Sequence, residues 1–264
     1  MVQLQRLAIA QRQISNRHID LTAEQQHYLG RVLRLQVGDR FIAIDGVGQW
    51  WLAQLLVMLP ASPPQAEILE AISVQNQELP IEVRLWVSLP KTGFDELVRY
   101  CTELGVSQIV PVISQRTVLK PSSQKVERWR RIIREAAEQS ERQIIPTLRD
   151  PLPLAKAFEE EGGLNLTATS QRYICVARGD LPHLYGCMSQ SKGDPIAIAT
   201  GPEGGWTTAE VEMAKANGFQ AVSLGRRILR ALTAPLVALS YVSAVWETKA
   251  TSEDYSDVQP ENLK

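Results

Sequence analysis

The feature that most constrains this chain is an apolar run that ends in a turn containing three glycines and one proline. The run is Ala197–Thr200, and the turn is Gly201-Pro202-Glu203-Gly204-Gly205. Because glycine accepts positive φ and lets a ligand approach the main chain closely, this turn predicts a pocket made largely of backbone. A second short run, Ala221–Leu224, ends in Gly225 and a group of arginines. Ligand clefts in α/β proteins lie at the carboxyl ends of strands, so both runs predict parts of one binding site.

The glycine turn differs from the common phosphate-binding motifs. Pro202 stands between close glycines, so the turn is not a dinucleotide-binding GxGxxG, and no Gly-Lys-Ser/Thr ends it as in a Walker A loop. A pocket of backbone donors and acceptors with apolar neighbours suits an adenine-type base with a zwitterionic tail better than a triphosphate. By itself such a turn is weak support for a site, because many glycine turns only connect a strand to a helix.

The first seventy or so residues predict a small β-rich unit with one helix. Thr22-Ala23-Glu24-Gln25 has the pattern of a capping box, and Asp45-Gly46 is typical of a hairpin turn. Short strands at this spacing favour a small barrel or a curled sheet. Its arginines leave two interpretations open, a solvated surface or a face that contacts phosphates.

The pattern of apolar and polar residues changes after the polar segment 75–80, which is the best candidate for a linker. Residues 81–89 alternate between apolar and polar side chains as a strand does, a helix is expected through Leu104, and a second strand at 109–113. This β-α-β order favours a parallel sheet. A helix is also predicted over 125–141, within the most basic stretch of the chain, Arg116–Arg149, whose charges form either a solvent-exposed face or a local basic patch for a partner.

The last part of the chain predicts two helices and a tail. Thr207-Thr208-Ala209-Glu210 is a second capping box, and a final helix is expected to begin near Thr233. That helix is apolar on more than one face, which predicts burial in the core and in a dimer interface. Residues 249–264 are polar and are expected to be disordered.

Composition excludes several other classes of protein. The formal net charge of −1 gives no global polybasic signal, so any affinity for nucleic acid must come from local patches. Three cysteines without metal-ligand spacing indicate free thiols in a reducing compartment and no metal site. The chain shows no signal-peptide pattern and no apolar run long enough to span a bilayer, so we expect a cytoplasmic protein without membrane contact.

Taken together, Thr200–Gly205 and Leu224–Arg230 resemble the paired motifs of SPOUT-class RNA methyltransferases, and more narrowly the RsmE family of 16S rRNA uracil N3-methyltransferases. The resemblance covers nearly the whole chain. The Lys91 turn, Ser114-Gln115-Arg116 and Glu138–Arg142 resemble the central region of that family. His27 with Arg31-Val32-Leu33-Arg34 resembles its N-terminal RNA-binding domain.

The resemblance implies an α/β fold class, a SPOUT methyltransferase domain with a C-terminal trefoil knot that follows a small β-barrel PUA-like domain. In this chain the PUA-like barrel corresponds to residues 1–75 and the knotted domain to residues 80–248. The implied activity is methylation of N3 of a specific uridine in 16S rRNA of the small ribosomal subunit, with S-adenosyl-L-methionine (SAM) as the methyl donor. A homodimer is implied as well.

The resemblance also assigns roles to residues. SAM is expected to be held by Thr200, Gly201, Pro202, Glu203, Gly204, Gly205, Leu224, Gly225, Ile228, Leu229 and Arg230. Arg230 is the first catalytic candidate, as the group that stabilises the developing uracil anion; a phosphate or dimer contact is the other interpretation. Glu203 is the second, as a proton or hydrogen-bond acceptor, unless it only caps the following helix. The residues expected to contact RNA are Arg17, Arg31, Arg34, Lys91, Arg116 and Arg142.

One position departs from the family pattern, because Leu232 stands where an acidic residue is frequent. We interpret that acid as a helix-start feature, since a carboxylate there also favours the positive end of the helix dipole. If the acid were instead an essential base, the chain would be an inactive RNA-binding protein associated with the ribosome. A SPOUT enzyme acting on tRNA is a further alternative.

Overall fold

The structure is a computed structural model, and it describes residues 4–58, 63–74, 76–161, 170–189 and 193–256. Contacts within the chain divide it into two compact units. The first consists of Met1–Glu78 and Arg134–Ile145, and the second of Leu79–Ile133 and Pro146–Lys264. The segment 134–145 was expected to belong to the second domain with the rest of its helix.

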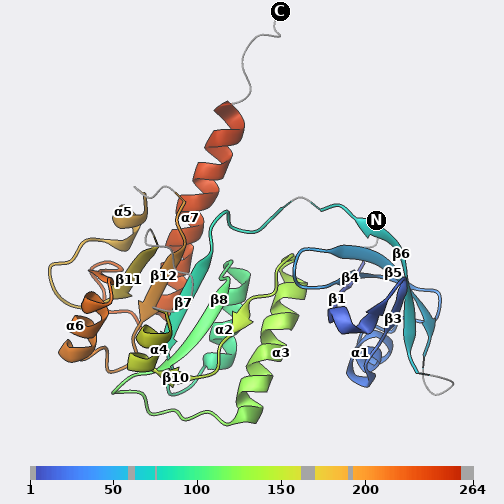
Figure 1. Ribbon diagram of the computed structural model, residues 1–264, viewed down its shortest axis with the longest axis horizontal. Helices are drawn as coiled ribbons and strands as arrows, with labels where there is room; N and C mark the ends of the chain where they lie inside the picture. The colour runs from blue at the N-terminus through green and yellow to red at the C-terminus, as the bar shows by residue number, and fades with distance from the viewer. Residues whose placement is uncertain (1–3, 59–62, 75, 162–169, 190–192, 257–264) are drawn as a thin grey trace, which may run out of the picture. The chain divides into compact units, whose positions relative to one another are not determined.

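The first unit is built on a six-stranded sheet (blue, Figure 1) with the order β1-β4-β5-β6-β3-β2. β1 pairs with β4 in parallel, and every other neighbouring pair in this sheet is antiparallel. The hairpin between β4 and β5 confirms the turn expected at Asp45-Gly46. The strands are β1 (Arg6–Ala8), β2 (Ile14–Ser15), β3 (His18–Asp20), β4 (Arg40–Ile44), β5 (Trp50–Val57) and β6 (Gln65–Ile72).

The short helix α1 (Ala23–His27) of this unit begins with the capping box expected at Thr22. The Thr22 hydroxyl accepts a hydrogen bond from the Gln25 N–H, while Oε1 of Gln25 accepts one from the Thr22 N–H. This confirms the first capping box. A short 3-10 helix, η1 (Gln11–Gln13), precedes α1, and a π-helical turn, η2 (Tyr28–Val32), follows it. The core beneath them contains Ile19, Leu29, Phe41 and Leu55, each fully buried.

The second unit contains a parallel seven-stranded sheet (Figure 1), as the β-α-β order predicted. Its order is β10-β8-β7-β12-β11-β13, with β9 paired to β8. The strands are β7 (Val83–Ser88), β8 (Gln108–Ile113), β9 (Thr147–Leu148), β10 (Leu152–Pro153), β11 (Gln171–Cys175), β12 (Ile196–Thr200) and β13 (Gln220–Val222). β12 and β13 are therefore separated by β11, with which both of them pair.

Both faces of this sheet are covered, as is usual for parallel sheets. Trp86 of β7 packs against Phe158 and Phe219, whereas its chain neighbours Leu85 and Val87 point to the opposite face and are equally buried. α7 contacts α2, α5 and β12. The helices are α2 (Phe94–Glu103), α3 (Ser123–Gln139), α4 (Leu154–Glu161), α5 (Leu184–Ser189), α6 (Thr208–Ala216) and α7 (Thr233–Ser256).

The C-terminal helix is longer than expected. α7 begins at Thr233 as predicted, but it continues to Ser256, into the segment 249–264 that was expected to be disordered. Most residues after Trp246 have no strong bias against helix, so the preceding turns can propagate through them. The rest of the tail lies outside the described residues. The trefoil knot remains a prediction.

Candidate active site

A cavity of about 330 Å³ opens at the carboxyl ends of three adjacent strands of the parallel sheet. β11 supplies residues 175–178, β12 leads into the glycine loop 201–206, and β13 leads into the loop 224–231. The two motifs are thus brought to one site, as the sequence predicted. The cavity is lined by Arg116, Cys175, Val176, Ala177, Arg178, Gly201, Pro202, Glu203, Gly204, Gly205, Trp206, Leu224, Gly225, Arg227, Ile228, Leu229, Ala231 and Ala234.

Two glycines of the first loop lie close to neighbouring side chains, and a third has a positive φ. A Cβ atom on Gly201 would lie 3.2 Å from the Trp206 ring, and one on Gly204 would lie 2.9 Å from Cδ of Arg116. Gly205 has a φ of 67° and no atom within 4 Å of a Cβ position, so its main chain faces open space. A ligand can therefore approach the backbone of this loop directly.

Two carboxylates hold the glycine loop to neighbouring loops. Oε1 of Glu203 accepts a hydrogen bond of 2.8 Å from the backbone N–H of Lys91. Glu210 is 7% exposed; its Oε1 accepts from the Gln115 N–H at 2.7 Å, and its Oε2 accepts from the Thr207 N–H at 2.8 Å. The second capping box is thus confirmed, and its carboxylate also reaches the loop that follows β8.

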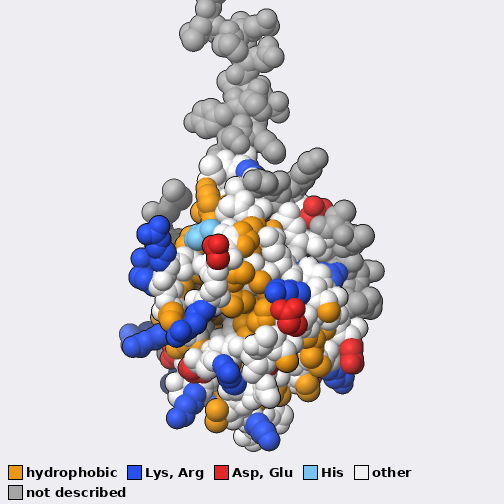
Figure 2. Space-filling model, turned by 90° about the vertical axis from the view of Figure 1, so that its left-hand side faces the viewer, with side chains coloured by type: hydrophobic (Ala, Val, Ile, Leu, Met, Phe, Trp, Pro, Cys, Tyr) orange, Lys and Arg blue, Asp and Glu red, His pale blue; other side chains and the backbone are white. Residues whose placement is uncertain are grey.

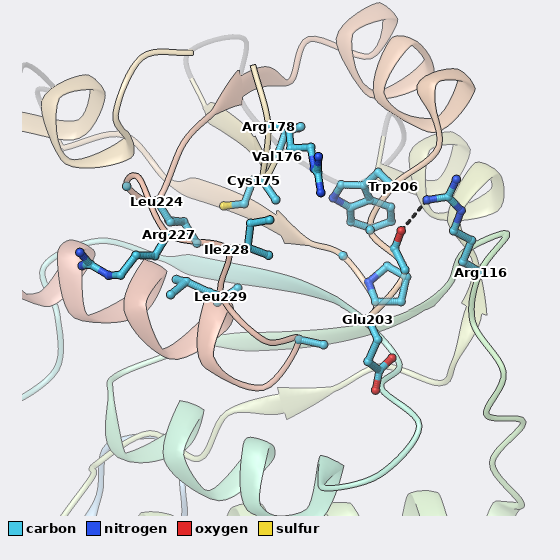
Figure 3. A pocket seen from close by; sticks show the side chains of 18 residues that line it. Arg116, Cys175, Val176, Arg178, Glu203, Trp206, Leu224, Arg227, Ile228 and Leu229 are labelled. Atoms are coloured by element: carbon cyan, nitrogen blue, oxygen red, sulfur yellow. Dashed lines mark hydrogen bonds between the residues drawn. The ribbon is translucent and has the colours of Figure 1, made fainter. Parts of the chain in front are cut away.

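Arg116 forms a third link, because its guanidinium donates a hydrogen bond to the carbonyl oxygen of Gly204 (dashed line, Figure 3). The backbone around Arg116 is fixed by three hydroxyl groups. Oγ of Ser88 lies 2.7 Å from Oγ of Ser114 and 2.9 Å from Oγ1 of Thr117. Arg116 therefore lies at the wall of the cavity, and part of its hydrogen-bonding capacity is used to hold the glycine loop.

The residues expected to hold the cofactor are placed as follows. Gly201 to Gly205, Leu224, Gly225, Ile228 and Leu229 line the cavity. Thr200 is fully buried below it and directs its hydroxyl toward the Trp86 carbonyl at 3.4 Å. Arg230 is exposed, and within the described chain it does not belong to the lining.

Glu203 points away from the centre of the cavity in Figure 3, toward the Lys91 turn. Its carboxylate therefore has a structural partner, which favours a structural role over proton chemistry. That partner is the Lys91 backbone, whereas the cap of the following helix, which was the expected alternative, is formed by Thr207 and Glu210. Leu232, the position that departs from the family pattern, packs over the turn before α2. A Cβ on Gly93, whose φ is 83°, would lie 2.6 Å from Cδ1 of Leu232.

The strand β11 contributes lining residues that the sequence analysis missed. Cys175, Val176 and Arg178 come from this strand and its following loop, and Arg178 carries a charge into the site. Burial raises the pKa of the Cys175 thiol to about 12, so it stays protonated and forms an apolar part of the wall. In the sequence, β11 was visible only as a short apolar run. Nothing in that run indicated that the strand lies between β12 and β13, so its residues were not expected in the site.

The cavity fits the expected cofactor by its shape and its chemistry. Its wall combines apolar side chains such as Val176, Leu224 and Leu229 with the free backbone of the glycine loop. Nε1 of Trp206 is buried and has no hydrogen-bond partner among the described residues, so a donor is available at the wall. A volume near 330 Å³ lies at the lower end of the range for small-molecule sites, which is about 300–1,000 Å³. The apolar part suits an adenine ring, and the backbone part suits a polar tail.

The arginines expected to contact RNA fall into two groups. Arg31, Arg34, Lys91 and Arg116 have exposed side chains. Arg17 is also exposed, but its guanidinium donates to the carbonyl oxygens of Ile68 and Leu69.

Arg142 must be corrected. It is 7% exposed and forms an ion pair with Glu78 inside the first unit. The same carboxylate accepts from the backbone N–H groups of Gln143 and Ile144, at 2.9 and 3.0 Å. A buried, paired guanidinium fixes this turn and presents no free charge to a phosphate. We therefore remove Arg142 from the candidate RNA contacts.

Two further properties are limited to the described residues. In these residues no group of three or more His, Cys, Asp or Glu side chains could hold a metal ion. No helix formed by them is long and apolar enough to cross a membrane.

Comparison with known proteins identifies the family. Residues 77–243 match the model of the RNA methyltransferase domain, and residues 21–60 match the model of the RNA methyltransferase PUA domain. The chain is 48% identical to the ribosomal RNA small subunit methyltransferase E of Synechocystis sp., over 92% of this chain and 78% of that protein. It is 31% identical to the protein of the same name from Bacillus subtilis, over 84% of this chain and 88% of the relative.

Solved structures agree with this assignment. The ribosomal RNA small subunit methyltransferase E of Neisseria gonorrhoeae, bound to S-adenosyl methionine, is 30% identical, with a TM-score of 0.81 over 92% of this chain and 98% of that one. A putative methyltransferase from Legionella pneumophila in complex with SAM is 26% identical, with a TM-score of 0.80 over 92% and 98% of the two chains. The chain therefore belongs to the RNA methyltransferase family, among the ribosomal RNA small subunit methyltransferases E.

Proposed function

We propose that this protein methylates N3 of a uridine in 16S rRNA of the small ribosomal subunit, with SAM as the methyl donor. The observation that carries the proposal is the cavity at the ends of β11, β12 and β13, which both family motifs line. Relatives bearing the rRNA methyltransferase name, and related structures solved with SAM, support the same donor and substrate class. Since small ribosomal subunits reside in the cytoplasm, we assign the activity to that compartment.

The cavity performs its part mainly by positioning. SAM, when bound, supplies an electrophilic methyl group on a sulfonium. The glycine loop, fastened by Glu203, Glu210 and Arg116, presents a fixed backbone to it. A fixed geometry accelerates transfer because the entropy of alignment is lost before the reaction begins. N3 of uracil must lose its proton before it is methylated. Because this edge of the base is hidden in a paired duplex, the uracil must be unstacked or already unpaired when it enters the site.

Arg230 remains our candidate for stabilising the developing uracil anion. It is exposed, follows the lining residue Leu229 directly, and has no hydrogen-bonded or ionic partner for its side chain among the described residues. Its backbone carbonyl accepts from the N–H groups of Thr233 and Ala234, at 2.9 and 3.0 Å, so the position is fixed at the start of α7. A guanidinium held there is free to face the RNA.

The test is the Arg230→Ala variant, assayed with labelled SAM and small subunits that lack the modification. We expect the transfer rate to fall about 100-fold, as when one donor to a developing anion is removed, with SAM affinity changed less than threefold. A normal rate would refute the role of Arg230. Transfer to tRNA but not to small subunits would refute the substrate, and no transfer by the wild-type protein would favour the inactive RNA-binding alternative.

We also propose that the protein works as a homodimer. Figure 2 shows a broad group of hydrophobic side chains on one face, flanked by Lys and Arg. Two large apolar side chains near the site, Tyr185 and Ile228, are 47% and 64% exposed. A contiguous exposed apolar area favours an interface between two copies of the chain. Sedimentation equilibrium of the full chain measures the mass in solution, which should be that of a dimer.

The RNA contacts that we retain are Arg17, Arg31, Arg34, Lys91 and Arg116.

A further inference from the structure

We propose that Arg178 binds the carboxylate of the methionine tail of SAM and so fixes the direction of that tail in the cavity. This inference rests on the proposed cofactor, and it adds a residue that determines how the cofactor is held.

The origin of Arg178 is fixed by the sheet. β11 ends at Cys175, and the next residue, Val176, donates a backbone hydrogen bond of 2.9 Å to the Val222 carbonyl of β13. Two residues later the chain reaches Arg178, which lines the cavity. Figure 3 shows its side chain extending toward the interior of the site, on the side of Trp206.

The charges that line the cavity are unevenly distributed. Three arginines, Arg116, Arg178 and Arg227, face a single acid, Glu203. The Glu203 carboxylate accepts from the Lys91 N–H and points away from the interior, so it neutralises none of them there. The positively charged part of the wall therefore favours an anionic group of the ligand beside it.

Arg178 is the arginine that this anionic group can reach. Arg116 already donates to the Gly204 carbonyl, and Arg227 points away from the site in Figure 3. Arg178 forms no hydrogen bond or ion pair with any other described residue. An unpaired guanidinium directed into a concave site is available for a ligand, and its planar fork matches a carboxylate in a bidentate arrangement.

The chemistry of SAM favours one partner for this guanidinium. The sulfonium and the ammonium group are both cationic and are repelled by it, the adenine ring is neutral, and the carboxylate is the only anion. Apolar wall residues such as Leu224 and Leu229 suit the adenine. Placing the carboxylate at Arg178 directs the tail toward the end of β11, which leaves the sulfonium farther from the positive charge.

A backbone phosphate of the RNA is the competing partner, because phosphates also accept bidentate hydrogen bonds from arginine. The two partners differ in when they bind. A carboxylate contact exists in the binary complex with SAM, without any RNA. A phosphate contact would affect only the binding of the small subunit and its dependence on salt.

The experiment is isothermal titration of the full chain with two ligands, SAM and decarboxylated SAM, which lacks only the carboxylate. The variants are Arg178→Gln, Arg178→Lys and, as the matched control, Arg226→Gln, which removes an equal charge from an exposed position outside the cavity. We expect Arg178→Gln to weaken SAM binding about 10- to 100-fold, the effect of losing a charge-assisted pair. The same variant should bind decarboxylated SAM as well as the wild-type protein does.

Arg178→Lys should lose less affinity than Arg178→Gln, since the charge remains and the fork is lost. Unchanged SAM affinity in Arg178→Gln, or equal losses for both ligands, would overturn the inference. So would a loss in Arg226→Gln as large as that in Arg178→Gln. Unaltered SAM binding with weaker binding of the small subunit would assign Arg178 to RNA instead. If the wild-type protein itself does not bind SAM, the proposed function fails, which is a separate result.

Discussion

The links that hold the glycine loop can be tested through Glu210, which is almost completely buried and accepts hydrogen bonds from two loops. Its Oε2 accepts from the Thr207 N–H and hydroxyl, at 2.8 and 2.9 Å, and its Oε1 accepts from the Gln115 N–H at 2.7 Å. Truncation to alanine removes the acceptor for all three donors. The perturbation therefore acts on the cap of α6 and on the contact between the loops after β8 and β12 at the same time.

The magnitude follows from the two contacts. Loss of a capping interaction costs about 1 kcal/mol, and an N–H left without its acceptor costs about 1–3 kcal/mol, with the lower end appropriate where water can enter. The Gln115 contact is only partly buried, so we expect Glu210→Ala to lower the free energy of unfolding of the second unit by about 2–3 kcal/mol. SAM affinity should fall as well, because the loop backbone is no longer held in the binding geometry.

The assay combines urea unfolding with titration of SAM, and the control is Thr207→Ala. That variant loses the hydroxyl of the cap but keeps the bond between Glu210 and Gln115, so it should cost about 1 kcal/mol and change SAM affinity little. If Glu210→Ala is no less stable than Thr207→Ala and binds SAM equally well, then the contact to Gln115 does not hold the loop and the reasoning is wrong.

Two further predictions concern the first unit. Burial raises the pKa of Glu138 to about 7, although the Ala8 N–H bond to its carboxylate acts in the opposite direction. Since the folded pKa lies above the ordinary one, the free energy of unfolding is greatest below about pH 4 and falls as the pH rises toward 7. Glu138→Gln should remove this pH dependence and raise the free energy of unfolding by up to about 3 kcal/mol at pH 8. Urea unfolding at several pH values measures both effects. Arg34 has a φ of 59°, a left-handed conformation that is strained for a residue with a side chain, so Arg34→Gly should stabilise the fold by about 0.5–1 kcal/mol. The same variant should bind small subunits more weakly if Arg34 contacts RNA. A loss of stability would contradict the idea that this position is strained.

Local features of the fold followed from short stretches of sequence. Both capping boxes, at Thr22 and Thr207, formed as expected, because a side-chain oxygen and a carboxamide or carboxylate three residues later satisfy each other locally. The hairpin at Asp45-Gly46 and the start of α7 at Thr233 were also found. These elements depend on interactions within a few residues, so a single sequence specifies them.

Long-range partners did not follow in this way. Arg142 was expected from the family resemblance to contact RNA, but it is buried and forms an ion pair with Glu78, far from it in the chain. Glu203 likewise has a partner that the sequence did not indicate, because its carboxylate accepts a hydrogen bond from the Lys91 backbone N–H. A charge in a sequence carries no information about which distant group neutralises it.

By itself, the sequence indicated two strand ends that open into glycine-containing turns, because glycine conformations and strand periodicity are local properties. That the two turns belong to one site was expected from the family resemblance. Only the tertiary structure placed β11 between the strands of these motifs, and with it Cys175, Val176 and Arg178 in the wall of the cavity. The order of strands in a parallel sheet is set by which apolar faces pack together across long crossover connections. That choice is made by the whole core, and it decided which charged side chains line the cavity.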